Sequence, residues 1–97
     1  MAKVRTKISI AGFKYGEIAE GLGDFLAELR DRPWLINPRA EWASEQTLLL
    51  VTIETEGDDP PLESEGVFDE VRDCVIACFN FSSERVSFNI LEAEFVR

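Results

Sequence analysis

Hydrophobic side chains recur every second residue in some stretches of this chain and every three or four residues in others, and the order of these stretches predicts the fold. Alternation predicts strands at residues 3–10, 47–56 and 85–96. A spacing of three and four predicts amphipathic helices at 16–31 and 64–79. Each helix is expected to turn one apolar stripe toward a sheet built from the strands.

A less regular stretch, residues 34–43, contains Pro38, which an edge strand accepts and a central strand does not. As a hairpin partner of 47–56, it completes the order strand, helix, strand, strand, helix, strand. This order predicts a ferredoxin-like two-layer sandwich (βαββαβ), an α+β fold with a four-stranded antiparallel sheet and two helices on one face. We expect residues 1–97 to form a single α+β domain of this kind.

Three local features of the sequence leave alternatives open. Gly21 and Gly23, within the first helix, mark either close packing against a neighbour or a bend. Residues 57–63 have the composition of a loop, with Ser64 as the N-cap of the second helix. Beyond Leu91 the phase of the last strand is ambiguous, and either a bulge or a frayed end would resolve it.

The positions of charged residues favour antiparallel pairing of the first and third strands. Lys3 and Arg5, at the start of the first strand, would then lie opposite Glu54 and Glu56, at the end of the third. Opposite charges on neighbouring strands contribute roughly 0.2–1 kcal/mol each. Parallel pairing would place these acidic and basic residues at opposite ends of the sheet.

The sheet face that no helix covers is predicted to be an interface. Leu48 and Leu50 fall on it if the alternate residues Leu49 and Val51 point toward the helices. An exposed apolar patch marks an interface, and a homodimer that pairs two sheets is the simplest form. Alternatively, a twisted sheet and its loops cover these side chains. The candidate interface residues are Lys3, Arg5, Lys7, Trp42, Leu48 and Leu50.

Acidic residues outnumber basic residues by nineteen to ten, and the excess lies in the second part of the chain. Between Glu41 and Asp73 there are eleven carboxylates and a single basic residue, Arg72. Such a field repels the phosphates of nucleic acids and the anionic surface of membranes. We therefore expect neither nucleic acid nor a membrane as a partner.

The acidic segment has two interpretations. It is either a solvated face that keeps a small domain soluble or a surface that attracts a basic protein partner, as in an inhibitor or an immunity protein. The second interpretation makes the chain a non-enzymatic interaction module. Its candidate surface consists of Asp58, Asp59, Glu63, Glu65, Asp69, Glu70 and Asp73.

Residues that commonly carry catalysis are scarce in this sequence. There is no histidine, and the serines lack the context of an activated nucleophile. Cys74 and Cys78 lie one helical turn apart, so a disulfide between them would enclose almost no loop. Two cysteines without histidine are also too few ligands for a metal site. We expect both thiols to be buried and reduced, which fits the cytoplasm. We also expect no enzymatic activity, cofactor or metal.

One alternative is a small-molecule-binding or regulatory domain. Its site would lie at the connection between the first strand and the first helix, or at the dimer interface. Lys14, Tyr15 and nearby glycines would be the natural contacts, although the glycine spacing matches no phosphate-binding motif. A weak enzymatic role is a further alternative, for which no catalytic residues can be named.

Overall fold

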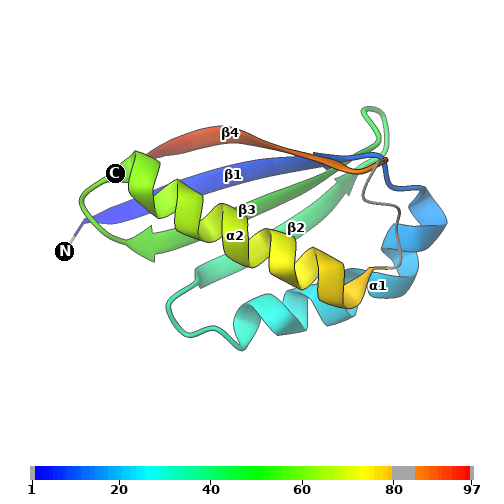
Figure 1. Cartoon of the computed structure of the whole chain (residues 1–97), viewed down its shortest axis with the longest axis horizontal. Helices are drawn as coiled ribbons and strands as arrows, with labels where there is room; N and C mark the ends of the chain where they lie inside the picture. The colour runs from blue at the N-terminus through cyan, green and yellow to red at the C-terminus, as the bar shows by residue number, and fades with distance from the viewer. Residues whose placement is uncertain (1, 80–84, 97) are drawn as a thin grey trace.

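The computed structural model describes residues 2–79 and 85–96 and contains the predicted order of elements (Figure 1). Its helices are α1 (Tyr15–Arg30) and α2 (Pro60–Cys78). Its strands are β1 (Lys3–Ala11), β2 (Ile36–Ala43), β3 (Leu48–Glu56) and β4 (Ser87–Phe95). The strands form one sheet in the order β2-β3-β1-β4, and all neighbours are antiparallel.

Both helices lie on the same face of this sheet (Figure 1). Helix α2 packs across β1 and β4, whereas α1 lies beside β2 and packs against α2. The chain therefore has the ferredoxin-like α+β sandwich that its sequence predicts. Within the described part of the chain, no helix is both long and apolar enough to span a membrane.

The core lies between the helices and the inward face of the sheet, as strand alternation predicts. β1 and β3 contribute Val4, Ile8, Ile10, Leu49, Val51 and Ile53 to it, and each is at most 1% exposed. The helical stripes contribute Ile18, Phe25 and Leu29 from α1 and Val67, Val71, Cys74 and Val75 from α2. Burying one large aliphatic or aromatic side chain stabilises a fold by roughly 1.5–3 kcal/mol, so this layer supplies most of the stabilising free energy.

The charge pattern correctly predicted the register of the two central strands. Lys3 lies opposite Glu56, and Arg5 lies opposite Glu54. Both pairs are on the outer face of the sheet, because their neighbours along β1, Val4 and Thr6, are buried. The outer face is thus fixed by register, and its charged residues can be placed row by row.

A bulge in β4 resolves the ambiguous phase of the last strand. Lys7 pairs with Glu92 and Ile8 pairs with Ile90, so Leu91 is an extra residue in β4. In a regular strand, residues 90 and 92 would point to the same face. Because of the insertion, Ile90 points inward and Glu92 shares the outer face with Lys7. The bulge, rather than a frayed end, therefore keeps two acidic residues of β4 out of the core.

Helix α2 begins earlier than the sequence predicted. Asp59, not Ser64, is the N-cap, and its side chain accepts a hydrogen bond from the backbone N–H of Leu62 at 3.3 Å. Pro60 and Pro61 then occupy the first turn, where their missing N–H groups cost nothing because those groups have no helical partner. The assignment of 57–63 as a loop is wrong from Pro60 onward. The expected close of this helix, at residues 80–83, lies outside the described residues.

The two glycines of α1 differ in their surroundings. A Cβ built on Gly21 would lie 2.5 Å from the ring of Phe79, so this glycine allows close packing between α1 and the end of α2. A Cβ built on Gly23 would meet no atom within 4 Å. Close packing is therefore the correct interpretation for Gly21 and is wrong for Gly23.

Candidate functional site

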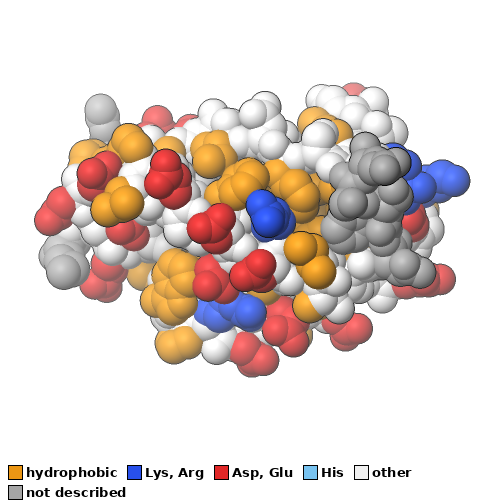
Figure 2. Space-filling model, in the orientation of Figure 1, with side chains coloured by type: hydrophobic (Ala, Val, Ile, Leu, Met, Phe, Trp, Pro, Cys, Tyr) orange, Lys and Arg blue, Asp and Glu red, His pale blue; other side chains and the backbone are white. Residues whose placement is uncertain are grey.

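The outward face of α2 combines acidic and large hydrophobic side chains. Glu65, Asp69 and Asp73 follow one another at intervals of four residues, and all three are exposed. Leu62 and Ile76 lie at the two ends of this row and are 63% and 58% exposed. Figure 2 shows acidic and hydrophobic side chains intermingled on the side of the molecule that α2 presents. We call these five residues the α2 surface.

The carboxylates of the α2 surface form no ion pair in the part of the chain that the structure describes. Across residues 2–79 and 85–96, no ion pair within 4 Å involves Glu65, Asp69 or Asp73. Arg72 is exposed on the same helix and likewise forms no ion pair with a described residue. With three carboxylates against this one arginine, the surface keeps an excess of negative charge for an external partner.

The structure separates the remaining predicted acidic residues from this row. Glu70 faces the connection that follows α1, where one of its oxygens lies 2.6 Å from Nε of Arg32. Asp59 caps the helix, and Asp58 is exposed immediately before it. Glu63 is half-buried on the first turn, beside the end of β3. The predicted set is thus spread over several sides of α2, and three of its members share the outward face.

On the outer face of the sheet, acidic and basic residues alternate from strand to strand. Arg5 lies between Glu54 of β3 and Glu94 of β4. Lys7 has its Nζ 3.7 Å from a carboxylate oxygen of Glu92. This face presents a balanced charge pattern, in contrast to the α2 surface.

The predicted sheet interface is gathered on this outer face, except for one residue. Leu48 and Leu50 are half-buried there, at the end of the face that also carries Ala11 and Ala43. The placement of Trp42 on this face is wrong. Trp42 pairs with the buried Leu49 and packs against the core on the helix side.

The displacement of Trp42 has a local cause in β2. Asn37 has a positive φ of 48°, and the β2–β3 register shifts between Ile36 and Arg39. This irregularity at Pro38 sets which residues of the edge strand face inward. The sequence pattern of 34–43 is too irregular to show that phase.

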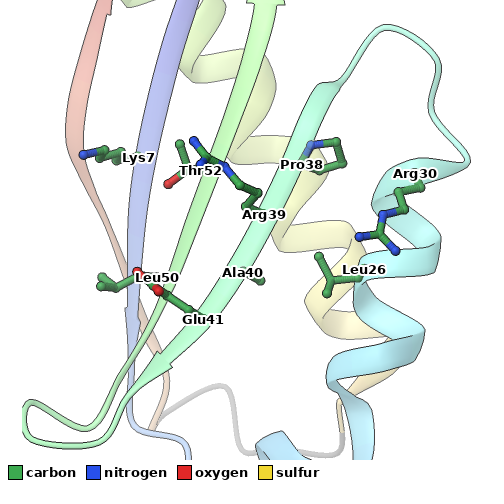
Figure 3. Close-up of a pocket in the computed structure, with 9 residues that line it drawn as sticks. All are labelled: Lys7, Leu26, Arg30, Pro38, Arg39, Ala40, Glu41, Leu50 and Thr52. Atoms are coloured by element: carbon green, nitrogen blue, oxygen red, sulfur yellow. The ribbon is translucent and has the colours of Figure 1, made fainter.

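A hollow of about 450 Å³ lies at the β2 edge of the sheet (Figure 3). Two arginines line it without an ion-pair partner among the described residues, Arg30 of α1 and Arg39 of β2. Figure 3 shows Arg39 extending across β3 toward Thr52, whereas Arg30 reaches from α1 on the other side of Pro38. Because the edge strand separates the two guanidinium groups, they do not form one anion site.

The start of α1, a candidate small-molecule site, is occupied by the chain's own carboxylate. The backbone N–H of Lys14 donates to Oε1 of Glu17 at 2.8 Å, and Arg85 binds Oε2 of Glu17 at 2.6 Å. The Lys14 N–H and then Arg85 lower the pKa of Glu17. An external anion would have to displace this internal one, so the connection is poorly suited to the ligand that the alternative hypothesis requires.

The two cysteines differ in burial. Cys74 is fully buried and Cys78 is half-buried, so the prediction of burial is correct for the first and too strong for the second. Burial raises the pKa of the Cys74 thiol to about 11 and also raises the pKa of Cys78. Neither thiol has the lowered pKa of a nucleophile. In the described ranges, no group of three or more acidic or cysteine side chains is arranged to hold a metal ion.

No protein-family model, curated protein or solved structure matches the chain. Its function therefore has to be inferred from its own surfaces.

Proposed function

We propose that this chain is a non-enzymatic binding domain whose α2 surface attaches to a basic protein partner, in the manner of an inhibitor or an immunity protein. The observation that carries the proposal is the row Glu65, Asp69 and Asp73, which forms no ion pair with a described residue and is bounded by exposed Leu62 and Ile76.

This combination of charge and apolar area is suited to protein recognition. Unpaired carboxylates accelerate encounter with a basic surface through long-range attraction. The exposed leucine and isoleucine then offer apolar area that the partner can remove from water. A purely solubilising face would account for the carboxylates but not for two large aliphatic side chains left more than half exposed on the same helix.

Capture experiments with matched charge variants test the proposal. The α2 variant carries Glu65→Gln, Asp69→Asn and Asp73→Asn; the sheet-face control carries Glu41→Gln, Glu54→Gln and Glu94→Gln. Each removes three negative charges from exposed or half-exposed positions. We expect the wild type and the control to capture the same basic protein from the source cell at low salt, and the α2 variant to lose it. Capture should also fail at about 1 M salt, where the screening length is roughly 3 Å.

Equal capture by both variants would contradict the proposal, because total charge would then matter more than its position. Absence of any basic protein in the wild-type capture would remove its support altogether.

We also propose a homodimer that pairs the outer faces of two sheets. The observation that favours it is the grouping of Leu48 and Leu50 with Ala11 and Ala43 at one end of a face that neither helix covers. The alternating charges of the rest of that face would be complementary between two copies. We further propose a cytoplasmic location, which the two free cysteines support.

A further inference from the structure

A second hollow, of about 290 Å³, lies where the start of β2, the end of β3 and the first turn of α2 meet. Its wall combines an indole ring, two aliphatic side chains and two carboxylates, and no basic residue lines it. The lining residues are Pro33, Trp34, Ile36, Thr55, Glu56 and Glu63. The sequence does not predict this site, because residues 57–63 have the composition of a loop, whereas Glu63 lies on the first turn of α2.

The residues around this hollow differ in their exposure and surroundings. Trp34 remains 46% exposed although it is a large aromatic residue. The Glu63 side chain lies against Gly57, where an added Cβ would come within 2.5 Å of the Glu63 carboxyl carbon. Thr55, which also lines the hollow, is only 1% exposed, and its buried Oγ1 has no hydrogen-bond partner among the described residues.

We propose that this hollow receives a lysine or arginine side chain of the basic partner, an inference that rests on the proposed function. A cation over the face of Trp34 would gain a cation–π interaction. Glu63 would accept a charge-assisted hydrogen bond from its head group, and the negative charge of Glu56 at the end of β3 would add to the attraction. The aliphatic stem of the same side chain would pack against Pro33 and Ile36.

Two neighbouring features favour a side chain over other occupants. The apolar share of the wall is poorly suited to a bare divalent cation, which requires six or more oxygen ligands for calcium or several retained waters for magnesium. Lys3 lies opposite Glu56 in the sheet, but no ion pair within 4 Å joins these two described residues. The carboxylates of the hollow therefore remain available to an incoming cation.

Nuclear magnetic resonance can test the hollow with tetralysine as the probe. The chain contains two tryptophans, and each contributes one indole N–H signal. The Trp42→Phe variant assigns the two signals. Because Trp42 packs on the core side of β2, it serves as an internal control. Tetralysine should shift the Trp34 indole signal and leave the Trp42 signal in place.

A matched pair of charge variants completes the test. Glu63→Gln and Glu65→Gln remove the same charge two residues apart, but only Glu63 lines the hollow. We expect Glu63→Gln to weaken tetralysine binding about three- to fivefold more than Glu65→Gln does, within the range of a partly exposed ion pair. Trp34→Leu should weaken binding about two- to fivefold. Dispersed amide signals in each variant show that the fold is intact.

The outcomes separate this inference from the proposed function. If tetralysine binds but the Trp34 signal does not move and both charge variants weaken binding equally, the hollow is not the site, whereas the acidic surface remains one. If tetralysine does not bind the wild type at low salt, both proposals are overturned.

Discussion

The α2 surface and the outer face of the sheet both carry several charges, yet their charges are arranged differently. On the sheet, Arg5 lies between two acidic residues and Lys7 forms an ion pair with Glu92. On α2, three exposed carboxylates have no cationic neighbour within ion-pair distance in the described part of the chain. The two faces therefore differ in the internal pairing of their charges rather than in the presence of charges. Under the proposed function, the absence of internal partners is the property that marks the binding surface.

The largest effect on stability should come from placing a charge on the inward face of α2 while leaving its outward face unchanged. Val71 is fully buried, so Val71→Asp places an unpaired carboxylate in the core. Its desolvation cost rivals the whole stability of a small domain, which is about 5–15 kcal/mol. We expect this variant to be unfolded by circular dichroism. Its neighbour Arg72 is exposed, and Arg72→Asp should melt within a few degrees of the wild type. An unchanged melting temperature for Val71→Asp would mean that the inward face of α2 is misassigned.

The next largest effect concerns the sheet face. If two copies pair through this face, the apolar surface that they remove from water stabilises the dimer by about 25 cal/mol per Å². Leu50→Glu should therefore shift a dimer to a monomer in sedimentation at high micromolar concentration, while the fold survives. A monomeric wild type at that concentration would refute the sheet-face dimer. An unfolded Leu50→Glu would instead show that Leu50 belongs to the core.

The two faces of the central strands could be predicted from the sequence, because the side chains of β1 and β3 alternate between the two faces without interruption. A period of two fixes both faces of a strand at once, so the paired charges Lys3–Glu56 and Arg5–Glu54 followed directly. The same logic failed in β2, where the irregularity at Asn37 and Pro38 reset the phase and turned Trp42 inward. Alternation cannot locate such a shift, because it depends on how the edge strand meets its neighbour.

The candidate site was harder to predict than the fold for a related reason. The seven acidic residues of 58–73 looked like one group in the sequence, but a helix distributes them around its axis. Placing the start of α2 at Pro60 instead of Ser64 turns Leu62 and Glu63 from loop residues into helical ones. The exposure of Leu62 and the hollow beside Trp34 both depend on that difference, and on tertiary contacts that spacing does not encode.

The two cysteines should differ in reactivity, and this difference checks which side of α2 faces inward. Cys74 is buried and its pKa is raised to about 11, whereas Cys78 is half-buried. A thiol reagent should label Cys78 first and label Cys74 only at the rate of opening of the fold. The raised pKa also means that the folded state holds the Cys74 proton more tightly than the unfolded chain does. Stability should therefore fall as pH rises from about 9 to 11, and less steeply in Cys74→Ala. Rapid labelling of both thiols at neutral pH would contradict the burial of Cys74.

The smallest expected effect comes from single-charge variants that compare α2 with the outer face of the sheet. Arg32→Gln frees Glu70 of α2, and also Glu28 of α1, from an ion pair, and Lys7→Gln frees Glu92 of the sheet. Each variant removes one positive charge and should cost no more than about 1 kcal/mol of stability. If unpaired charge on α2 is what attracts the partner, Arg32→Gln should bind the captured basic protein faster at low salt than Lys7→Gln does. Equal acceleration by both variants would show that only net charge matters.

The association rate of the captured partner with the wild type, the α2 variant and the sheet-face control is the most direct test of the α2 surface. Electrostatic steering changes such rates by factors of roughly 10–1,000 and is sensitive to salt. We predict that the α2 variant associates at least about tenfold more slowly than the wild type at low salt, and that the control stays within about threefold of it. The gap should close as salt is raised to about 1 M. Equal rates for the two triple variants at low salt would contradict a binding role for the α2 surface.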